Sequence, residues 1–113
     1  MIKVSVFAKR RPDLTYEQFN EYWKDRHAPL LMSLDSFKSS VRRYTQQRPL
    51  NNVPADLPVL SYDGVAEVWF DDLPSAMSVF THQDYTSIVA KDEENFLDRT
   101  KTMIFLSSET QIV

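Results

Sequence analysis

The sequence lacks cysteine and has a single glycine, Gly64, in 113 residues. Without cysteine there can be no disulfide bond, no thiolate nucleophile and no thiolate metal ligand. One glycine cannot build a Gly-x-Gly-x-x-Gly turn, a phosphate-binding loop or a Gly-x-Ser-x-Gly elbow, so no nucleotide cofactor is expected. Apolar runs are also short of the roughly 18 residues that a membrane helix needs. We therefore expect a soluble, cytoplasmic protein with no membrane partner.

Basic residues are outnumbered by acidic ones, and histidine is scarce. The chain has 13 Lys and Arg against 16 Asp and Glu, a net charge of −3, and we expect no nucleic acid partner because its field would repel phosphates. Its two histidines, His27 and His82, lie far apart and form no His-x-x-x-His pair. The sequence therefore predicts no metal site and no cofactor.

What is present is the composition of an ordinary globular protein. Hydrophobic residues make up 42% of the chain and charged residues 26%, and a length of 113 residues is enough for one core and too short for two. We expect residues 1–113 to form a single domain. Only residues 48–64, with Pro49, Pro54 and Pro58, interrupt the pattern, and they predict a long loop.

Hydrophobic periodicity predicts the secondary structure. Period-two or continuous apolar patterns predict strands over 2–9, 40–47, 64–70 and 100–107. Thr15 and Gln18 predict a capping box at the start of a helix, and Pro29 should end that helix near His27.

A second helical region should follow the third strand. Asp71 or Asp72 is a candidate N-cap, with Pro74 in the first turn. The apolar stripe breaks at 82–84, and a further helix should then run through Leu97.

This element order matches the split βαββαβ layout of α+β, ferredoxin-like domains. It predicts a four-stranded antiparallel sheet with helices on one face. Large apolar residues on the other face, such as Phe7, Trp69 and Phe105, need a cover. We expect a homodimer in which two sheets form a dimeric α+β barrel with a cavity in each half. The 48–64 loop should pack over the cavity mouth or across the partner.

Several runs of residues together carry a resemblance to a known family. They are Lys-Arg-Arg-Pro-Asp-Leu-Thr-Tyr-Glu-Gln-Phe at 9–19, Tyr-Trp at 22–23, His-Ala-Pro-Leu at 27–30, and the segments 41–46, 62–71 and 95–98. The chain resembles the EthD family over nearly its whole length. The resemblance implies the dimeric α+β barrel, which the element order predicts independently.

The resemblance implies function less sharply. Members of the EthD family accompany ether degradation or process aromatic polyketides as dehydratases, cyclases or decarboxylases. Similar barrels include muconolactone isomerases, plant polyketide cyclases and cofactor-free quinol monooxygenases.

His27 and Asp92 are the first candidates for catalysis. His27 lies on the apolar stripe of the first helix, where burial and the helix end would act on its protonation in opposite directions. The alternative is a structural histidine that binds a carbonyl at the helix end. Asp92 lies on the apolar side of the last helix and needs a partner. The partner is either a cavity histidine or, for a carboxylate at the edge of the apolar stripe, Arg99, Lys101 or solvent. Glu93 is expected to be one of its solvated neighbours.

His82 and Tyr85 follow the helix break. In the similar plant polyketide cyclases, a histidine and a tyrosine carry the proton transfers, so both residues are candidates for catalysis here. The alternative for His82 is a residue of a surface turn. Five aromatic residues are candidates for a substrate-binding wall, and otherwise for core or barrel wall: Phe7, Trp23, Tyr44, Tyr62 and Trp69.

Together these observations predict a cofactor-independent enzyme that acts by proton transfer on a hydrophobic small molecule, aromatic or derived from a polyketide. The reaction would be a dehydration, a cyclisation or a decarboxylation, of lyase or isomerase type. A phenol or β-dicarbonyl substrate is its own electron sink, so a base, an acid and a dry pocket suffice. The alternatives are a non-catalytic protein that binds an aromatic for an oxygenase, and a cofactor-free quinol monooxygenase.

Overall fold

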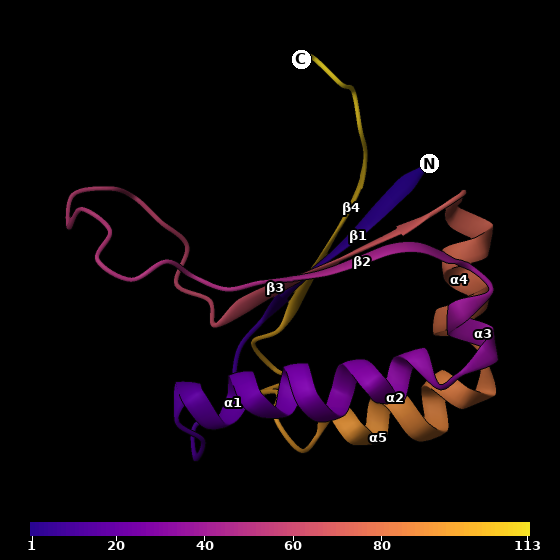
Figure 1. The fold of residues 1–113 in the computed structure, drawn as a ribbon, viewed down its shortest axis with the longest axis horizontal. Coiled ribbons are helices and arrows are strands. Elements are labelled where there is room, and N and C mark those ends of the chain that lie inside the picture. The colour runs from indigo at the N-terminus through magenta and orange to yellow at the C-terminus, as the bar shows by residue number, and fades with distance from the viewer.

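The computed structural model describes residues 1–113, and its centre is a four-stranded antiparallel sheet (Figure 1). The strands are β1 (Ile2–Ala8), β2 (Val41–Gln47), β3 (Gly64–Phe70) and β4 (Met103–Ser108), in the order β2-β3-β1-β4. The predicted ferredoxin-like arrangement is confirmed. Its fourth strand begins three residues later than predicted, because Asp98 accepts hydrogen bonds from the backbone and hydroxyl of Thr100 and holds residues 98–102 in a turn.

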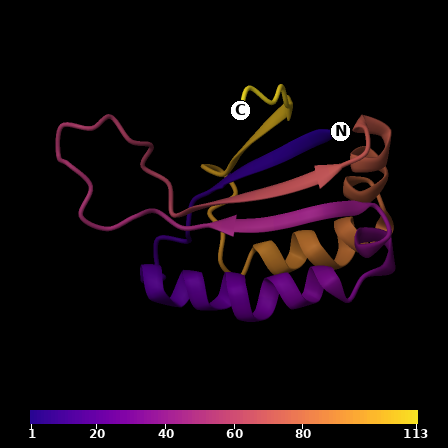
Figure 2. The ribbon, with the colours of Figure 1, turned by 45° about the horizontal axis from the view of Figure 1, so that its top comes forward.

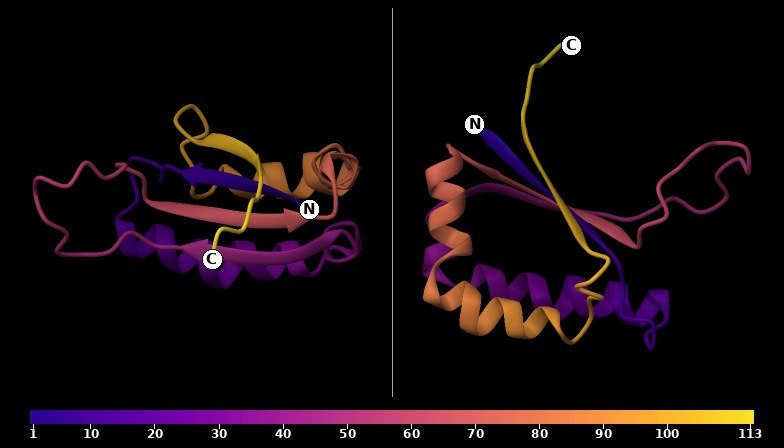
Figure 3. Two further views of the ribbon diagram at one scale, coloured as in Figure 1. Left: turned by 90° about the horizontal axis from the view of Figure 1, so that it is seen from above. Right: turned by 180° about the vertical axis from the view of Figure 1, so that it is seen from behind.

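All helices cover one face of this sheet (Figure 3). The first helical run comprises α1 (Tyr16–Tyr22), the π-helical turn η1 (Trp23–His27) and α2 (Ala28–Met32), followed by the short α3 (Asp35–Lys38). The second comprises α4 (Leu73–Phe80), the π-helical turn η2 (Tyr85–Val89) and α5 (Ala90–Glu93). None of these helices combines the length and the apolar character needed to cross a bilayer.

The helix start at Thr15 is as predicted, but the expected end near His27 is wrong. Thr15 and Gln18 form the reciprocal capping box. The chain then stays helical through Pro29 to Met32 by way of η1, in which the Ala28 N–H reaches back to the Trp23 carbonyl. The wide turn accommodates Pro29, whose ring and missing N–H would break a regular α-helical ladder. His27 therefore lies inside a helix, where the dipole of a helix end does not act on it.

The second helical run begins as predicted and ends earlier. The Asp72 side chain accepts a hydrogen bond from the Ser75 N–H at 2.8 Å, with Pro74 in the first turn of α4. The break is shorter than predicted, because helical structure resumes at Gln83. It continues through η2 and ends at Glu93 rather than near Leu97. Both helical runs thus contain one π turn.

The core lies between the sheet and the helices in two adjoining clusters. The first contains Val4, Leu31, Phe37, Val68, Phe70, Ala76, Val79 and Val89, and the second contains Ala8, Phe19, Trp23, Ala66, Phe96 and Leu97. Gly64 lets the Trp23 ring approach β3, because a Cβ at this position would lie 2.5 Å from Cζ3 and 2.7 Å from Cη2 of that ring. The one glycine of the chain is therefore required by packing.

The outer edge of the sheet is strongly apolar. Met103, Ile104, Phe105 and Leu106 of β4 are each more than half exposed. Trp69, which was expected to need a partner to cover it, is 9% exposed, since Lys3 and Arg43 lie over its ring and Glu109 accepts its indole N–H. β4 thus carries an uninterrupted run of four exposed apolar residues.

Candidate functional site

A cavity lies between the sheet and the two helical runs. Its volume is about 50 Å³, and 13 of its 15 lining residues are hydrophobic. It adjoins an outer chamber of about 310 Å³ beside β4, with which it shares Val6, Phe80, Tyr85, Glu93 and Leu97. Only His27 and Glu93 in the inner lining carry groups whose ordinary pKa lies below 7. An apolar pocket with few polar groups is the usual form of a small-molecule site.

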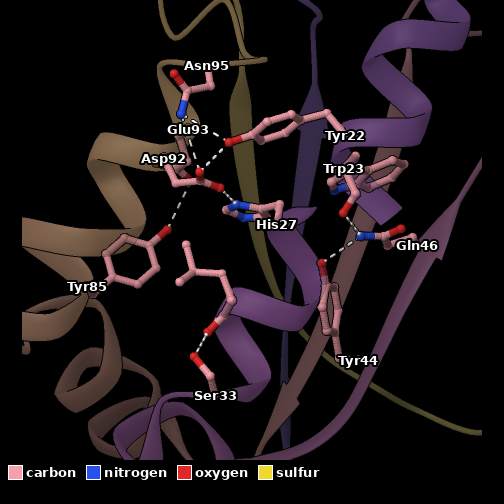
Figure 4. A network of polar contacts seen from close by, with 11 residues as sticks. Tyr22, Trp23, His27, Ser33, Tyr44, Gln46, Tyr85, Asp92, Glu93 and Asn95 are labelled. Atoms are coloured by element: carbon pink, nitrogen blue, oxygen red, sulfur yellow. Dashed lines mark hydrogen bonds and ion pairs between the residues drawn. The ribbon is translucent and has the colours of Figure 1, made fainter. Parts of the chain in front are cut away.

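His27, a buried residue of the cavity wall, pairs with the partly buried Asp92 (Figure 4). His27 Nδ1 lies 2.8 Å from Asp92 Oδ2, and the side chains are 7% and 15% exposed. The His27 ring also packs on Phe96, with ring centres 4.7 Å apart. The pair connects the first helical run to the last helix, so a contact between residues 65 positions apart in sequence forms part of the cavity wall.

The protonation of the pair follows from its surroundings. Burial lowers the pKa of His27, against the opposing effect of the Asp92 hydrogen bond and charge. Burial would raise the pKa of Asp92, but hydrogen bonds from Tyr22 and His27 outweigh it and lower this pKa. The ionised carboxylate can only accept, so His27 Nδ1 carries the hydrogen and donates it to Asp92. The lone pair then lies on Nε2, which makes no hydrogen bond within the chain.

Asp92 is held by further donors. The Tyr22 hydroxyl donates to Asp92 Oδ1 at 2.5 Å, and the Asn95 amide donates to the same oxygen at 3.3 Å and to the Tyr22 oxygen at 3.0 Å. A carboxylate fixed in this way sets both the tautomer and the orientation of its histidine. Sequence reasoning did not select Tyr22, although Tyr22 lies in the Tyr-Trp pair of the first helical run.

A second polar pair, Tyr85 and Glu93, lines both the cavity and the outer chamber. The Tyr85 hydroxyl donates to Glu93 Oε2 at 3.2 Å. Burial raises the pKa of Glu93, against the effects of Tyr85 and Arg99, and burial also raises the pKa of Tyr85. The expectation that Glu93 is merely a solvated neighbour of Asp92 is wrong. The repeat of four positions from Tyr85 through Val89 and Glu93 to Leu97 could have placed it on the cavity side of the helix.

Each π turn carries one of these polar residues. His27 is the last residue of η1, and Tyr85 is the first residue of η2. A π turn contains one residue more than the α-helical repeat, and it changes which side chains face the sheet. Both turns therefore bring a titratable group to a surface that is otherwise apolar.

The five aromatic candidates divide between the two faces of the sheet. Trp23 and Tyr44 line the cavity, and the Gln46 amide joins them by donating to the Trp23 carbonyl and the Tyr44 hydroxyl. Phe7, Tyr62 and Trp69 do not line it.

The alternation of side chains explains this division. Phe7 follows Val6, which lines the cavity, and it packs instead against Tyr62 at 5.6 Å between ring centres. Trp69 lies between Val68 and Phe70, both of which belong to the core on the helix side. Successive residues of a strand point to opposite faces, so Phe7 and Trp69 face away from the cavity.

His82 also lies outside the cavity. It is exposed, and its Nδ1 accepts a hydrogen bond from the Asp84 N–H at 3.0 Å. His82 is therefore a residue of a surface turn, and it does not line the cavity that His27 lines.

The 48–64 loop does not cover this cavity in its own chain. It extends away from the sheet and helices (Figure 2), and none of its residues lines either chamber. Its base is tied to β1 by the Asp63 N–H, which donates to the Ala8 carbonyl, and by Asp63 Oδ2, which accepts from the Arg10 N–H. The prediction that the 48–64 loop packs over the mouth of the cavity is therefore wrong for the single chain. Its other form, that the loop packs across the partner subunit of a dimer, stays a prediction.

No group of three or more His, Cys, Asp or Glu side chains is close enough to hold a metal ion. Two hydrogen-bonded pairs, His27 with Asp92 and Tyr85 with Glu93, instead lie at or beside the cavity. Each pair joins one proton donor to one acceptor, which is the arrangement used for acid/base chemistry.

Comparison with known proteins agrees with the fold. A family model described as the EthD domain matches residues 11–100. No curated protein matches the sequence.

Solved structures are similar over almost the whole chain. An EthD family protein from Bacillus halodurans is 18% identical with a TM-score of 0.71, covering 97% of this chain and 99% of its own. An EthD-like protein from Ralstonia eutropha is 17% identical with a TM-score of 0.74, covering 99% and 94%. A protein described as dimeric, with a ferredoxin-like fold, from Bacteroides fragilis is 16% identical with a TM-score of 0.66, covering 96% and 95%.

Proposed function

The chain belongs to the EthD family, and from this premise we propose that it is a cofactor-independent acid/base enzyme acting on a hydrophobic small molecule, aromatic or derived from a polyketide. The observation that carries the proposal is the buried His27 at the wall of an apolar cavity, hydrogen-bonded to the partly buried Asp92. A cavity lined only by apolar groups would instead suit a protein that binds an aromatic without reacting with it.

In the proposed reaction, His27 Nε2 removes a proton from carbon next to a carbonyl group. Asp92 holds the Nδ1 hydrogen and stabilises the imidazolium that forms. Trp23 and Tyr44 contribute the aromatic part of the wall against which a flat substrate would lie. A carbanion next to a carbonyl delocalises into an enolate, and this makes the site suitable for dehydration, aldol-type cyclisation or decarboxylation.

We further propose that the working unit is a homodimer. The exposed apolar residues of β4, Met103 to Leu106, support this assembly, because such a strip is costly to leave in water. The fold is shared with a protein described as dimeric. Light scattering should give twice the chain mass of 13.2 kDa at low micromolar concentration, and a stable monomer would contradict the proposal.

The proposed chemistry can be tested with benzoylacetone, an aromatic β-dicarbonyl compound whose enol absorbs in the ultraviolet. The protein should accelerate interconversion of the keto and enol forms. His27→Gln should reduce this acceleration by roughly 10² to 10⁴-fold, as expected for loss of a proton-transfer group. His82→Gln is the matched control, because it makes the same substitution at an exposed histidine outside the cavity.

The outcomes separate the candidate functions. A folded His27→Gln variant that keeps its activity contradicts the proposed role of His27. Binding of benzoylacetone without any acceleration supports the binding-protein alternative, and oxygen consumption with a naphthoquinol supports the monooxygenase. Loss of thermal stability with unchanged turnover per folded molecule indicates that His27 is structural.

A further inference from the structure

Glu93 is a polar group of the cavity that the proposed role of His27 and Asp92 leaves unused. It reaches the inner cavity and the outer chamber from α5, whereas His27 reaches the inner cavity from η1. Its Oε2 accepts from the Tyr85 hydroxyl at 3.2 Å, and no cation lies within ion-pair distance of it. The nearby Arg99 pairs at 3.7 Å with Glu94 instead. A carboxyl group without a cation in a largely apolar cavity is unusual, because burial disfavours its charge.

We propose that Glu93 is the general acid of this site, and that it protonates the substrate oxygen while His27 removes the proton from carbon. The inference rests on the proposed function and deepens it, since it specifies a substrate whose carbonyl or hydroxyl oxygen enters uncharged. Tyr85 is the positioning residue, because its hydroxyl holds one carboxyl oxygen and leaves the other free for the substrate.

The step balances as a tautomerisation. The substrate C–H bond breaks and its proton goes to His27 Nε2, while the C–H electron pair forms the C=C bond of the enol. The carbonyl oxygen takes the proton of the Glu93 carboxyl group and becomes a hydroxyl. The site is left with an imidazolium and a carboxylate, its total charge is unchanged, and water returns the proton from His27 to Glu93.

The environment favours the protonation states that this step needs. With ordinary pKa values of 6.5 for His27 and 4.5 for Glu93, neutral imidazole and neutral carboxyl would coexist in only about one molecule in a hundred. Burial lowers the pKa of His27 and raises that of Glu93, so the two states overlap more.

Other groups act on Glu93 from each element around it. On α5, the charge of Asp92 raises the pKa of Glu93, while Arg99 and the Tyr85 hydroxyl of η2 lower it. From the sheet, Tyr44 of β2 acts on Tyr85 and is itself kept neutral by a pKa that burial raises. His27 of η1 shares the cavity lining with Glu93. The net direction for Glu93 is upward, with burial as the largest cause.

The first experiment measures the pH dependence of benzoylacetone tautomerisation between pH 5 and 8, where the substrate is mainly uncharged. The wild-type rate should fall at low pH as His27 is protonated and at high pH as Glu93 ionises. Glu93→Gln should lower the rate by about 10 to 10³-fold and remove the alkaline fall, while the acidic fall remains. Glu94→Gln is the matched control, because it makes the same change at the exposed neighbouring residue.

A second measurement needs no activity. Infrared difference spectra should show a protonated carboxyl group with a pKa above the ordinary 4.5 in the wild type and in Glu94→Gln. This group should be absent from Glu93→Gln. No such carboxyl group, or its persistence in Glu93→Gln, overturns the inference. The inference is also overturned if Glu93→Gln keeps the wild-type rate and the wild-type decrease in rate at high pH. It is overturned as well if that decrease is lost in Tyr85→Phe but kept in Glu93→Gln. Retained activity in His27→Gln would instead contradict the proposed function, so the two failures can be distinguished.

Discussion

Replacing Gly64 by alanine should destabilise the protein by displacing the Trp23 ring. The new Cβ would lie 2.5 Å from Cζ3 and 2.7 Å from Cη2, about 1 Å closer than carbon atoms normally pack. Gly64 has no positive φ, so alanine does not strain the backbone here. The clash is with a ring that is 2% exposed and belongs to the buried core.

The magnitude follows from two opposing effects. Overpacking of this kind costs about 1–3 kcal/mol, and alanine returns about 0.4–1 kcal/mol by restricting the unfolded chain. We expect the free energy of unfolding to fall by about 1–2 kcal/mol, measured by urea unfolding with circular dichroism. Because Trp23 lines the cavity, affinity for benzoylacetone should fall as well.

A double-mutant cycle with Trp23→Phe tests the cause. Phenylalanine lacks the second ring to which Cζ3 and Cη2 belong, so Gly64→Ala should be nearly neutral in that background, with a coupling energy of about 1 kcal/mol or more. An equal cost of Gly64→Ala in both backgrounds would refute the explanation. So would a cost below about 0.5 kcal/mol with Trp23 in place.

Three further predictions follow from contacts elsewhere in the fold. Because burial lowers the pKa of His27 below its ordinary 6.5, the unfolded chain binds a proton that the folded chain does not, and the free energy of unfolding should fall as the pH drops from 7 to 5. Urea titrations at both pH values should show a smaller fall in His27→Gln, and an equal fall would contradict this origin. Tyr22→Phe removes the 2.5 Å hydrogen bond to Asp92 and should cost about 1.5–3 kcal/mol in urea unfolding, together with part of the tautomerase activity; unchanged stability would mean that Asp92 is held by its other donors. Thr15→Ala removes the cap of α1 and should cost about 1 kcal/mol in thermal unfolding, whereas Thr15→Ser should restore most of it.

The sheet and the helix starts could be predicted from local patterns. Alternation along β1 and continuous apolar residues along β3 identify strands, and the capping box at Thr15 identifies a helix start, because each signal acts within a few residues. The continuation through Pro29 could not be predicted in this way. It depends on a π turn stabilised by the packing of Trp23 and His27 against the sheet and the last helix.

The site was predictable in part for a related reason. His27 and Asp92 stand out as polar residues on apolar stripes, and the expectation that Asp92 needs a partner led to a cavity histidine as one option. Phe7 and Trp69 could not be assigned to a face, because strands with large apolar residues on both faces do not reveal which face the helices cover. Glu93 was overlooked because three consecutive acidic residues, 92–94, are typical of a solvated surface.

The two π turns also affect how this chain should be aligned with its relatives. Since η1 and η2 each contain one residue more than a regular helix of the same rise, a relative with a regular helix must show a one-residue gap at 23–27 or 85–89. Placing that gap in a neighbouring loop would shift every following helical position by about 100° around the axis. The histidine would then be paired with a residue that faces a different direction in the relative. An alignment therefore identifies the family members that share the polar groups of this cavity only if it places the gap correctly in each of the two π turns.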